Sequence, residues 1–252
     1  MSFHRATPLL LLAGLLTLST LAAPAAEAKK KEPTVQERYD DGQKYLKRGY
    51  YVKALEEFNR IRNYHRDDPM ALKAELAIAD VYFKKAEWDQ ARIAYEDFMR
   101  MHPRHEDLDY VVFRLGMTSF KKSPRISARD QTWTRQAVNA WSGFDNRYPS
   151  SEYSEEVAEN LQKCRDRLAR KEFQIGEFYF RRGAWPAVKA RMEQVLRLYP
   201  KSESVPDALA LMAISQYHLG EKDAAREVAE RLRTDHPDSR AIQLLERKAP
   251  EL

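Results

Sequence analysis

A proline recurs at one fixed distance after an apolar position, four times along this chain of 252 residues. The apolar position holds alanine three times and valine once, and the proline follows it by twelve residues each time. The pairs are Ala91 and Pro103, Ala137 and Pro149, Val188 and Pro200, and Ala225 and Pro237. Proline lacks an N–H, and its ring clashes with the preceding helical turn, so each of these prolines is expected to end a helix.

Small residues also occur in pairs twelve positions apart, such as Gly42 with Ala54 and Ala79 with Ala91. If each member lies on a different helix, the two axes can approach closely, and neighbouring aromatic residues fill the space beside the contact. The equivalent positions Ala54, Ala91, Ala137, Val188 and Ala225 are separated by 37, 46, 51 and 37 residues. Such a period resembles the tetratricopeptide repeat. We therefore predict an all-α tetratricopeptide-repeat solenoid of five helical hairpins; the alternative is an ordinary helical bundle with coincidental prolines.

Two of the gaps are longer than the others. Gly116 and Ala137 are 21 residues apart instead of 12, which predicts a loop insertion in repeat three, around residues 121–133, that leaves the stack. Insertions of this kind often lie on the binding face. The gap of 51 adds fourteen residues whose apolar positions follow a helical period, which predicts a long helix joining repeats three and four. Those apolar positions are Tyr153, Val157, Leu161, Cys164 and Leu168.

Composition agrees with an all-helical chain that binds partners. Glycine occurs only 8 times, and charged residues make up 32% with both signs interspersed, which is typical of solvated helix faces. The net charge of +5 includes three lysines at 29–31, so nucleic acid is not expected as a partner. Repeat arrays bind on extended surfaces and seldom carry catalytic machinery.

Residues that could support chemistry are few. Cys164 is the single cysteine, so no intramolecular disulfide can form, and we expect it to be a small buried residue. His102 and His105 flank Pro103 in a turn, which excludes a two-histidine helix face but leaves open a loop metal site with the acidic residues of 106–109. A solvated turn is the favoured interpretation. No nucleophile elbow, phosphate-binding glycine loop or Cys-x-x-Cys pair occurs, so we predict no catalytic, cofactor or metal site and no enzyme.

The N-terminus has the pattern of an export signal. A short basic start precedes an apolar run at 9–21, and Ala26-Glu27-Ala28 supplies the small residues that a signal peptidase reads. We expect a signal peptide at 1–28 and a charged leader at 29–35; an uncleaved anchor is the alternative.

Several segments resemble the BamD/YfiO family of the outer-membrane β-barrel assembly machinery. They are His102-Pro103-Arg104-His105 with Asp109-Tyr110, Arg129-Asp130-Gln131-Thr132, Tyr148 to Tyr153, Leu168 to Glu172, and Phe178 to Trp185. The likeness extends over roughly residues 36–240. A generic tetratricopeptide protein would share the proline spacing but not the Arg-Asp-Gln-Thr insertion or the Arg-Gly-Ala-Trp segment.

The resemblance implies a non-catalytic periplasmic scaffold at the inner face of the outer membrane. Such a protein docks onto the periplasmic domain of the barrel-inserting protein and receives unfolded β-barrel precursors, with accessory assembly lipoproteins as further partners. By this likeness repeats one and two (36–106) are the client-binding half, repeats three to five (107–247) are the docking half, and 248–252 is a tail.

The same resemblance assigns candidate site residues. Docking positions of the family fall on Phe178, Tyr179, Arg182 and Arg191, and Tyr45 and Tyr82 are weaker candidates for client binding. Tyr179 also occupies a packing position, and the two arginines also fit a solvated helix face.

The chain departs from the family at the lipid-accepting cysteine, which has no counterpart in residues 18–25. Membrane association is therefore expected through partners. The alternative function is a soluble periplasmic tetratricopeptide adaptor for another envelope complex.

Overall fold

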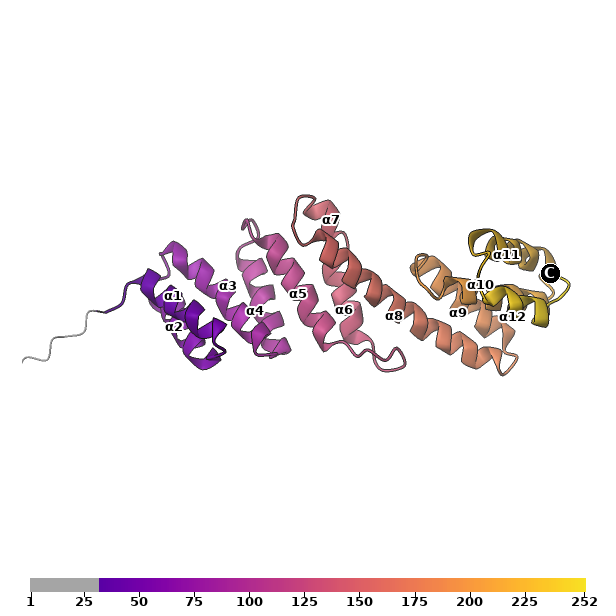
Figure 1. The fold of residues 1–252 in the computed structure, drawn as a ribbon, viewed down its shortest axis with the longest axis horizontal. Helices are drawn as coiled ribbons and strands as arrows, with labels where there is room; N and C mark the ends of the chain where they lie inside the picture. The colour runs from indigo at the N-terminus through magenta and orange to yellow at the C-terminus, as the bar shows by residue number, and fades with distance from the viewer. Residues whose placement is uncertain (1–31) are drawn as a thin grey trace, which may run out of the picture. The chain divides into compact units, whose positions relative to one another are not determined.

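The computed structural model describes residues 32–252, which form α-helices joined by turns, with no strand in that range (Figure 1). The expected signal peptide and residues 29–31 of the leader lie outside the described residues. The helices are α1 (Val35–Lys47), α2 (Tyr51–Tyr64), α3 (Pro69–Lys84), α4 (Trp88–Met101), α5 (Leu108–Lys122), α6 (Thr132–Trp141), α7 (Phe144–Arg147), α8 (Ser154–Phe180), α9 (Trp185–Leu198), α10 (Val205–His218), α11 (Lys222–Asp235) and α12 (Ala241–Lys248). The all-α prediction is confirmed.

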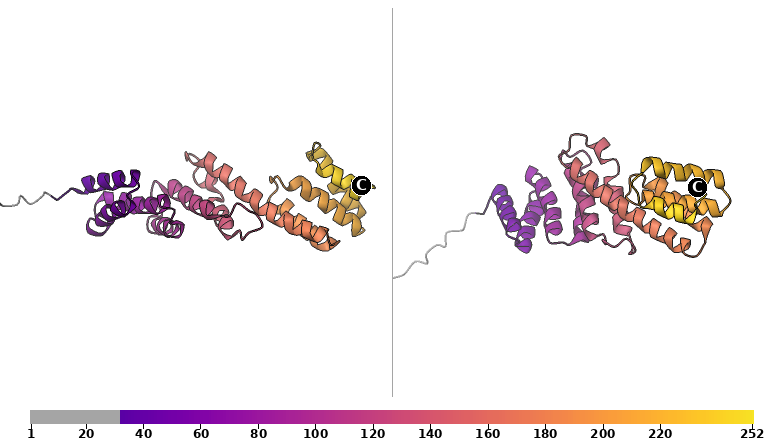
Figure 2. Two further views of the ribbon diagram at one scale, coloured as in Figure 1. Left: turned by 60° about the horizontal axis from the view of Figure 1, so that its bottom comes forward. Right: turned by 45° about the vertical axis from the view of Figure 1, so that its right-hand side comes forward.

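Helices that are neighbours in sequence pack against each other in chain order, as both views in Figure 2 show. The hairpins are α1 with α2, α3 with α4, α5 with α6, α8 with α9, and α10 with α11. The first helix of one pair also packs on the second helix of the pair before it, for example α3 on α2 and α10 on α9. This is the stacking that the tetratricopeptide pattern predicts.

Glycines at the first small position bring the two helices of a hairpin together. A β-carbon on Gly42 would lie 2.6 Å from the ring of Phe58, and one on Gly116 would overlap the indole of Trp141. Phe58 and Trp141 each lie four residues after the second small position of their hairpin, and both are fully buried. The missing side chain is therefore replaced by a large one from the facing helix, which confirms the close approach that the sequence predicts.

The four spaced prolines each follow a helix by two residues. Helices α4, α7, α9 and α11 end at residues 101, 147, 198 and 235, and the prolines stand at 103, 149, 200 and 237. The residue between has a φ of −124° to −139°, outside the helical range, as expected before a proline. One detail differs from the prediction: the second helix of the third hairpin does not run unbroken to Pro149. It divides into α6 and α7 because Gly143 adopts a left-handed conformation with φ of 69°.

Four hairpin turns share one backbone conformation. Gly49, Ala86, Gly183 and Gly220 each have a positive φ, between 61° and 81°. In each turn the residue after this position donates its N–H to a carbonyl five residues earlier, as Glu87 does to Tyr82 at 3.0 Å. This is the Schellman ending of a helix, which leads the chain directly into the second helix.

Helix α8 spans 27 residues and belongs to two parts of the core. Its first half, including the buried Cys164, packs with α5, α6 and α7. Its second half, including Phe173, packs with α9 and α10. The predicted long helix is therefore present, and both neighbouring hairpins bury part of it.

The insertion between α5 and α6, residues 123–131, is tied to α8 rather than leaving the stack. Gln131 is fully buried, and its side-chain amide donates to the carbonyls of Ile126, Ser127 and Arg129 at 2.9–3.3 Å. The Ser127 hydroxyl donates to Gln174 on α8 at 2.9 Å. The spacing of 21 residues between Gly116 and Ala137 led to the expectation of a loop that leaves the stack; the bonds from Gln131 satisfy carbonyls of the loop and fold it back toward α8.

Helix α12 was not anticipated from the sequence and packs on α10. Ala241 and Leu245 are buried in the same cluster as Leu209 and Ile214. The spacing of four residues between the apolar Ala241 and Leu245 is typical of one helix face and could have predicted this helix.

Candidate partner-binding surfaces

An exposed aromatic residue lies at the C-terminal end of α8. Phe178 is 43% exposed, although phenylalanine is usually buried. The guanidinium of Arg182 lies 3.5 Å from the centre of its ring and donates to the Phe178 carbonyl at 3.2 Å. A cation over an aromatic face is a favourable contact that also fixes the arginine's position. Two of the candidate docking residues, Phe178 and Arg182, are thus in direct contact and form one unit.

The insertion and α8 enclose a hollow of about 330 Å³ beside this unit. Its lining combines one insertion residue with one face of α8: Ala128, Lys171, Gln174, Ile175, Phe178 and Tyr179. Tyr179 stacks edge-on against Phe178 with ring centres 5.5 Å apart, and its other side packs on the α8–α10 core. The insertion and two of the candidate docking residues, Phe178 and Tyr179, therefore line one hollow, which we call the α8 hollow.

Arg191 lies on α9 and does not line the α8 hollow. It donates to the Glu172 carboxylate on α8 at 2.7 Å and to the Gln194 side chain at 3.3 Å. The side chains of Arg191 and Glu172 are 36% and 24% exposed, so the pair is accessible from outside. An arginine held in this way retains further N–H groups for a second carboxylate.

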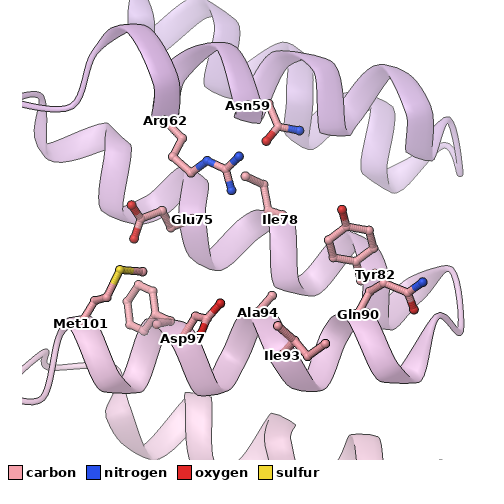
Figure 3. A pocket seen from close by; sticks show the side chains of 11 residues that line it. Asn59, Arg62, Glu75, Ile78, Tyr82, Gln90, Ile93, Ala94, Asp97 and Met101 are labelled. Carbon is pink, nitrogen blue, oxygen red and sulfur yellow. The ribbon is translucent and has the colours of Figure 1, made fainter.

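A second hollow, of about 290 Å³, lies in the N-terminal half between α2, α3 and α4 (Figure 3). Tyr82 and Ile78 contribute from α3, and Ile93 and Met101 from α4 are 51% and 56% exposed. The full lining is Asn59, Arg62, Glu75, Ile78, Tyr82, Gln90, Ile93, Ala94, Asp97, Phe98 and Met101. We call it the α2–α4 groove; apolar side chains and charged or amide groups both line it.

Tyr45 is not among the residues that line this groove. It lies on α1, 6.5 Å from the ring of Tyr50, with the ammonium of Lys53 5.6 Å from its ring centre. The structure therefore brings Tyr82 to the groove and places Tyr45 in a separate aromatic cluster. The second helices α2 and α4 supply most of the lining of the α2–α4 groove, and the first helix α3 supplies Glu75, Ile78 and Tyr82.

The residues considered for chemistry are engaged in packing. Cys164 is fully buried, and burial raises the pKa of its thiol to about 11, so the nucleophilic thiolate is disfavoured. His102 shares a hydrogen bond of 2.8 Å with Glu75, and the ring of His105 packs edge-on against Phe98. In residues 32–252, no three histidine, cysteine, aspartate or glutamate side chains are grouped closely enough to hold a metal ion.

A partly buried polar network, which the sequence did not indicate, joins α3, α4 and α5. Asp80 accepts hydrogen bonds from the hydroxyls of Tyr95 and Tyr110 at 2.6 and 2.7 Å, and the Nε of Arg114 lies 3.6 Å away. The Arg114 guanidinium also covers the ring of Phe83 at 3.6 Å. Burial raises the pKa of Asp80, while the two hydroxyls and Arg114 oppose that rise. The network crosses the predicted boundary between the two halves at residue 106.

No helix within the described range 32–252 combines the length and apolar character needed to cross a membrane.

Comparison with known proteins gives one family and several full-length relatives. The family model described as "YfiO: Outer membrane lipoprotein" matches residues 31–232. Proteins named outer membrane protein assembly factor BamD are similar in Neisseria meningitidis serogroup A (26% identical, 89% of each chain covered) and Xylella fastidiosa strain 9a5c (29%, 92% of this chain and 85% of that one). The Vibrio cholerae protein of the same name is 25% identical over 84% of this chain and 92% of its own length.

Among solved structures, a TPR2AB-domain complex of yeast Sti1 is similar with a TM-score of 0.44. It is 13% identical, and 86% of this chain and 84% of that chain are covered.

Proposed function

Because this chain belongs to the YfiO family, we propose that it is a non-catalytic factor in the assembly of outer membrane proteins. The names of its relatives support this function, since their similarity extends over most of both chains. The structural observation that carries the proposal is the exposed Phe178–Arg182 unit beside the α8 hollow. Its place in the cell would be the periplasm, at the inner face of the outer membrane.

In this proposal α8 and α9 dock onto the periplasmic domain of the barrel-inserting protein. Aromatic residues and arginine are enriched among the side chains that dominate binding energy at interfaces. Phe178 supplies exposed apolar area, and the hollow beside it could receive a side chain of the partner. Arg191 would extend the same contact surface onto α9 by sharing its guanidinium between Glu172 and a carboxylate of the partner.

We assign client binding to the α2–α4 groove. An extended β-strand precursor presents side chains alternately to two sides, so an apolar groove with polar edges suits it. Ile78 and Tyr82 on the floor and the exposed Ile93 and Met101 would contact apolar side chains of the client. Accessory assembly lipoproteins are proposed as further partners without an assigned surface.

The docking proposal is tested by reversing the charge at Arg191. Arg191→Glu places two carboxylates together on α8 and α9 and removes the donor to the partner. Loss of a desolvated charge pair costs about 2–5 kcal/mol, so binding of the partner's periplasmic domain should weaken at least about thirtyfold. Calorimetric titration measures the affinity, and circular dichroism checks that the helices remain folded.

A double variant separates docking from stability. Arg191→Glu with Glu172→Arg restores an ion pair between α8 and α9 but keeps the wrong charge toward the partner, so it should remain defective in binding. Arg226→Glu on α11, where the arginine is 58% exposed, is the matched control and should bind normally. If Arg191→Glu binds as tightly as the wild type, the docking assignment fails. Affinity purification from envelope extracts would then show whether a complex other than barrel assembly is the partner.

A further inference from the structure

A hollow of about 360 Å³ lies where α8 meets the end of α9 and the turn toward α10. Its lining residues are Gln162, Arg165, Arg197, Leu198, Tyr199, Pro200, Lys201 and Ser202. Three of these side chains are cationic and come from three different segments: Arg165 from α8, Arg197 from α9 and Lys201 from the turn. No carboxylate is among the lining residues. We call this hollow the basic pocket.

None of the three cations forms an ion pair with another residue of the described range 32–252. Elsewhere on the same two helices, Lys163, Lys189 and Arg191 each pair with a carboxylate at 2.6–2.7 Å. The carboxylate next to the pocket, Asp166, is already engaged. It accepts from the Gln162 side chain at 3.1 Å and from the backbone N–H of Glu203 at 3.2 Å.

The frame of the pocket is held by hydrogen bonds that do not involve the cations. The side-chain amide of Gln162 also donates to the carbonyl of Lys201 at 3.1 Å, which ties the turn to α8. Ser202 is buried, and its hydroxyl accepts the N–H of Ser204 at 3.2 Å. The positions of α8 and the turn are therefore fixed in the absence of a ligand, and the hydrogen bonds that fix them leave the charged groups of Arg165, Arg197 and Lys201 available to a ligand.

We propose that the basic pocket binds a phosphate group. A planar carboxylate satisfies one guanidinium through two parallel bonds. Three cations approaching from three segments suit a tetrahedral group that carries more than one negative charge and directs its oxygens several ways. The phosphate can belong to a phospholipid headgroup or to a small soluble ligand, and the pocket's chemistry is the same for both. The inference does not depend on the proposed role in outer membrane protein assembly.

The test uses the purified protein with two phosphate probes. One arm titrates inorganic pyrophosphate by calorimetry; the other measures co-sedimentation with phosphatidylcholine vesicles that contain phosphatidic acid, against phosphatidylcholine vesicles alone. Binding in the vesicle arm only identifies a headgroup site, and binding of pyrophosphate identifies a site for soluble phosphate. In either case, Arg165→Ala and Arg197→Ala should each weaken binding about tenfold or more, and added salt should weaken it further.

Arg226→Ala is the matched control, because Arg226 is an exposed arginine that pairs with Asp223 on α11, outside the pocket. It should bind like the wild type. The proposal is overturned if neither probe binds, if the pocket variants bind as well as the control, or if only an acidic protein partner competes for the pocket.

Discussion

At the scale of single residues, four hairpin turns have an equivalent position with a positive φ, which favours glycine. Three of these turns have glycine there, and one has alanine. Ala86 has a φ of 61°, whereas Gly49, Gly183 and Gly220 occupy the equivalent position in the other turns. A β-carbon in the left-handed region costs roughly 1–2 kcal/mol, which exceeds the extra chain entropy that glycine brings to the unfolded state. Ala86→Gly should therefore raise the free energy of unfolding by about 0.5–1 kcal/mol, measured by urea denaturation.

The control for this change is Ala190→Gly, at an exposed position inside α9. Glycine there should lower the free energy of unfolding by about 1 kcal/mol, because it only weakens the helix. Equal losses in both variants would show that the turn at Ala86 is not strained.

The partly buried Asp80 gives the folding stability a pH dependence of definite sign. Burial is the largest influence on its pKa and raises it above the value of 3.8 for an unperturbed aspartate. The folded state thus binds this proton more tightly than the unfolded state, so the stability that Asp80 contributes falls as the pH rises above that value. Asp80→Asn removes this titration. We therefore compare the free energy of unfolding of the wild type with that of Asp80→Asn. The advantage of the wild type over the variant should decrease from about pH 4 to about pH 7.

Urea denaturation of both proteins across that range measures the difference, and Asp145→Asn at an exposed position on α7 is the control. A wild-type advantage that grows with pH would mean that the attraction between Asp80 and Arg114 outweighs the burial of the carboxylate.

At the scale of helices, the close contact between α5 and α6 depends on the absence of one side chain. A β-carbon on Gly116 would overlap Trp141, which is fully buried and donates to the Phe113 carbonyl at 3.3 Å. The indole therefore has no free space into which to move. Gly116→Ala should lower the free energy of unfolding by about 1–3 kcal/mol, even though alanine favours a helix by up to about 1 kcal/mol.

Thermal unfolding of Gly116→Ala tests this contact. Asn139→Ala, on the exposed side of α6, should stay within about 0.5 kcal/mol of the wild type. If the melting temperature of Gly116→Ala equals or exceeds that of Asn139→Ala, the close packing of α5 on α6 is contradicted.

Features with local signals could be predicted from the sequence, and those built from distant side chains could not. Pro103 and the small residues Ala79 and Ala91 act within one hairpin, so the helix end and the helix pairing followed from their spacing. Asp80 and Tyr110 are thirty residues apart, and a lone aspartate in a helix has the pattern of a solvated position, so their hydrogen bond was invisible. The family resemblance pointed to Phe178 and Arg182, but only the structure shows that the insertion borders the same hollow.

At the scale of the described chain, the core is a series of clusters that share the first helix of each hairpin. Helices α3, α5, α8 and α10 each contribute buried residues to two neighbouring clusters. This explains why α10 has ten buried residues and α11, of the same length, has three. First helices are covered on two sides, whereas second helices keep one face for solvent.

The continuous helix α8 also sets the angular phase between the hairpins at its two ends. Each residue of a helix turns the chain by about 100° and advances it by about 1.5 Å, so a single insertion near Arg165 would rotate everything after it by more than a quarter turn. Seven added residues would leave the angle within about 20° while lengthening the helix by about 10 Å. Changes in the length of α8 during evolution should therefore come in steps close to a whole number of turns, such as about seven or about eleven residues, because these keep Phe178 and Arg191 facing the same way relative to the groove on α2–α4.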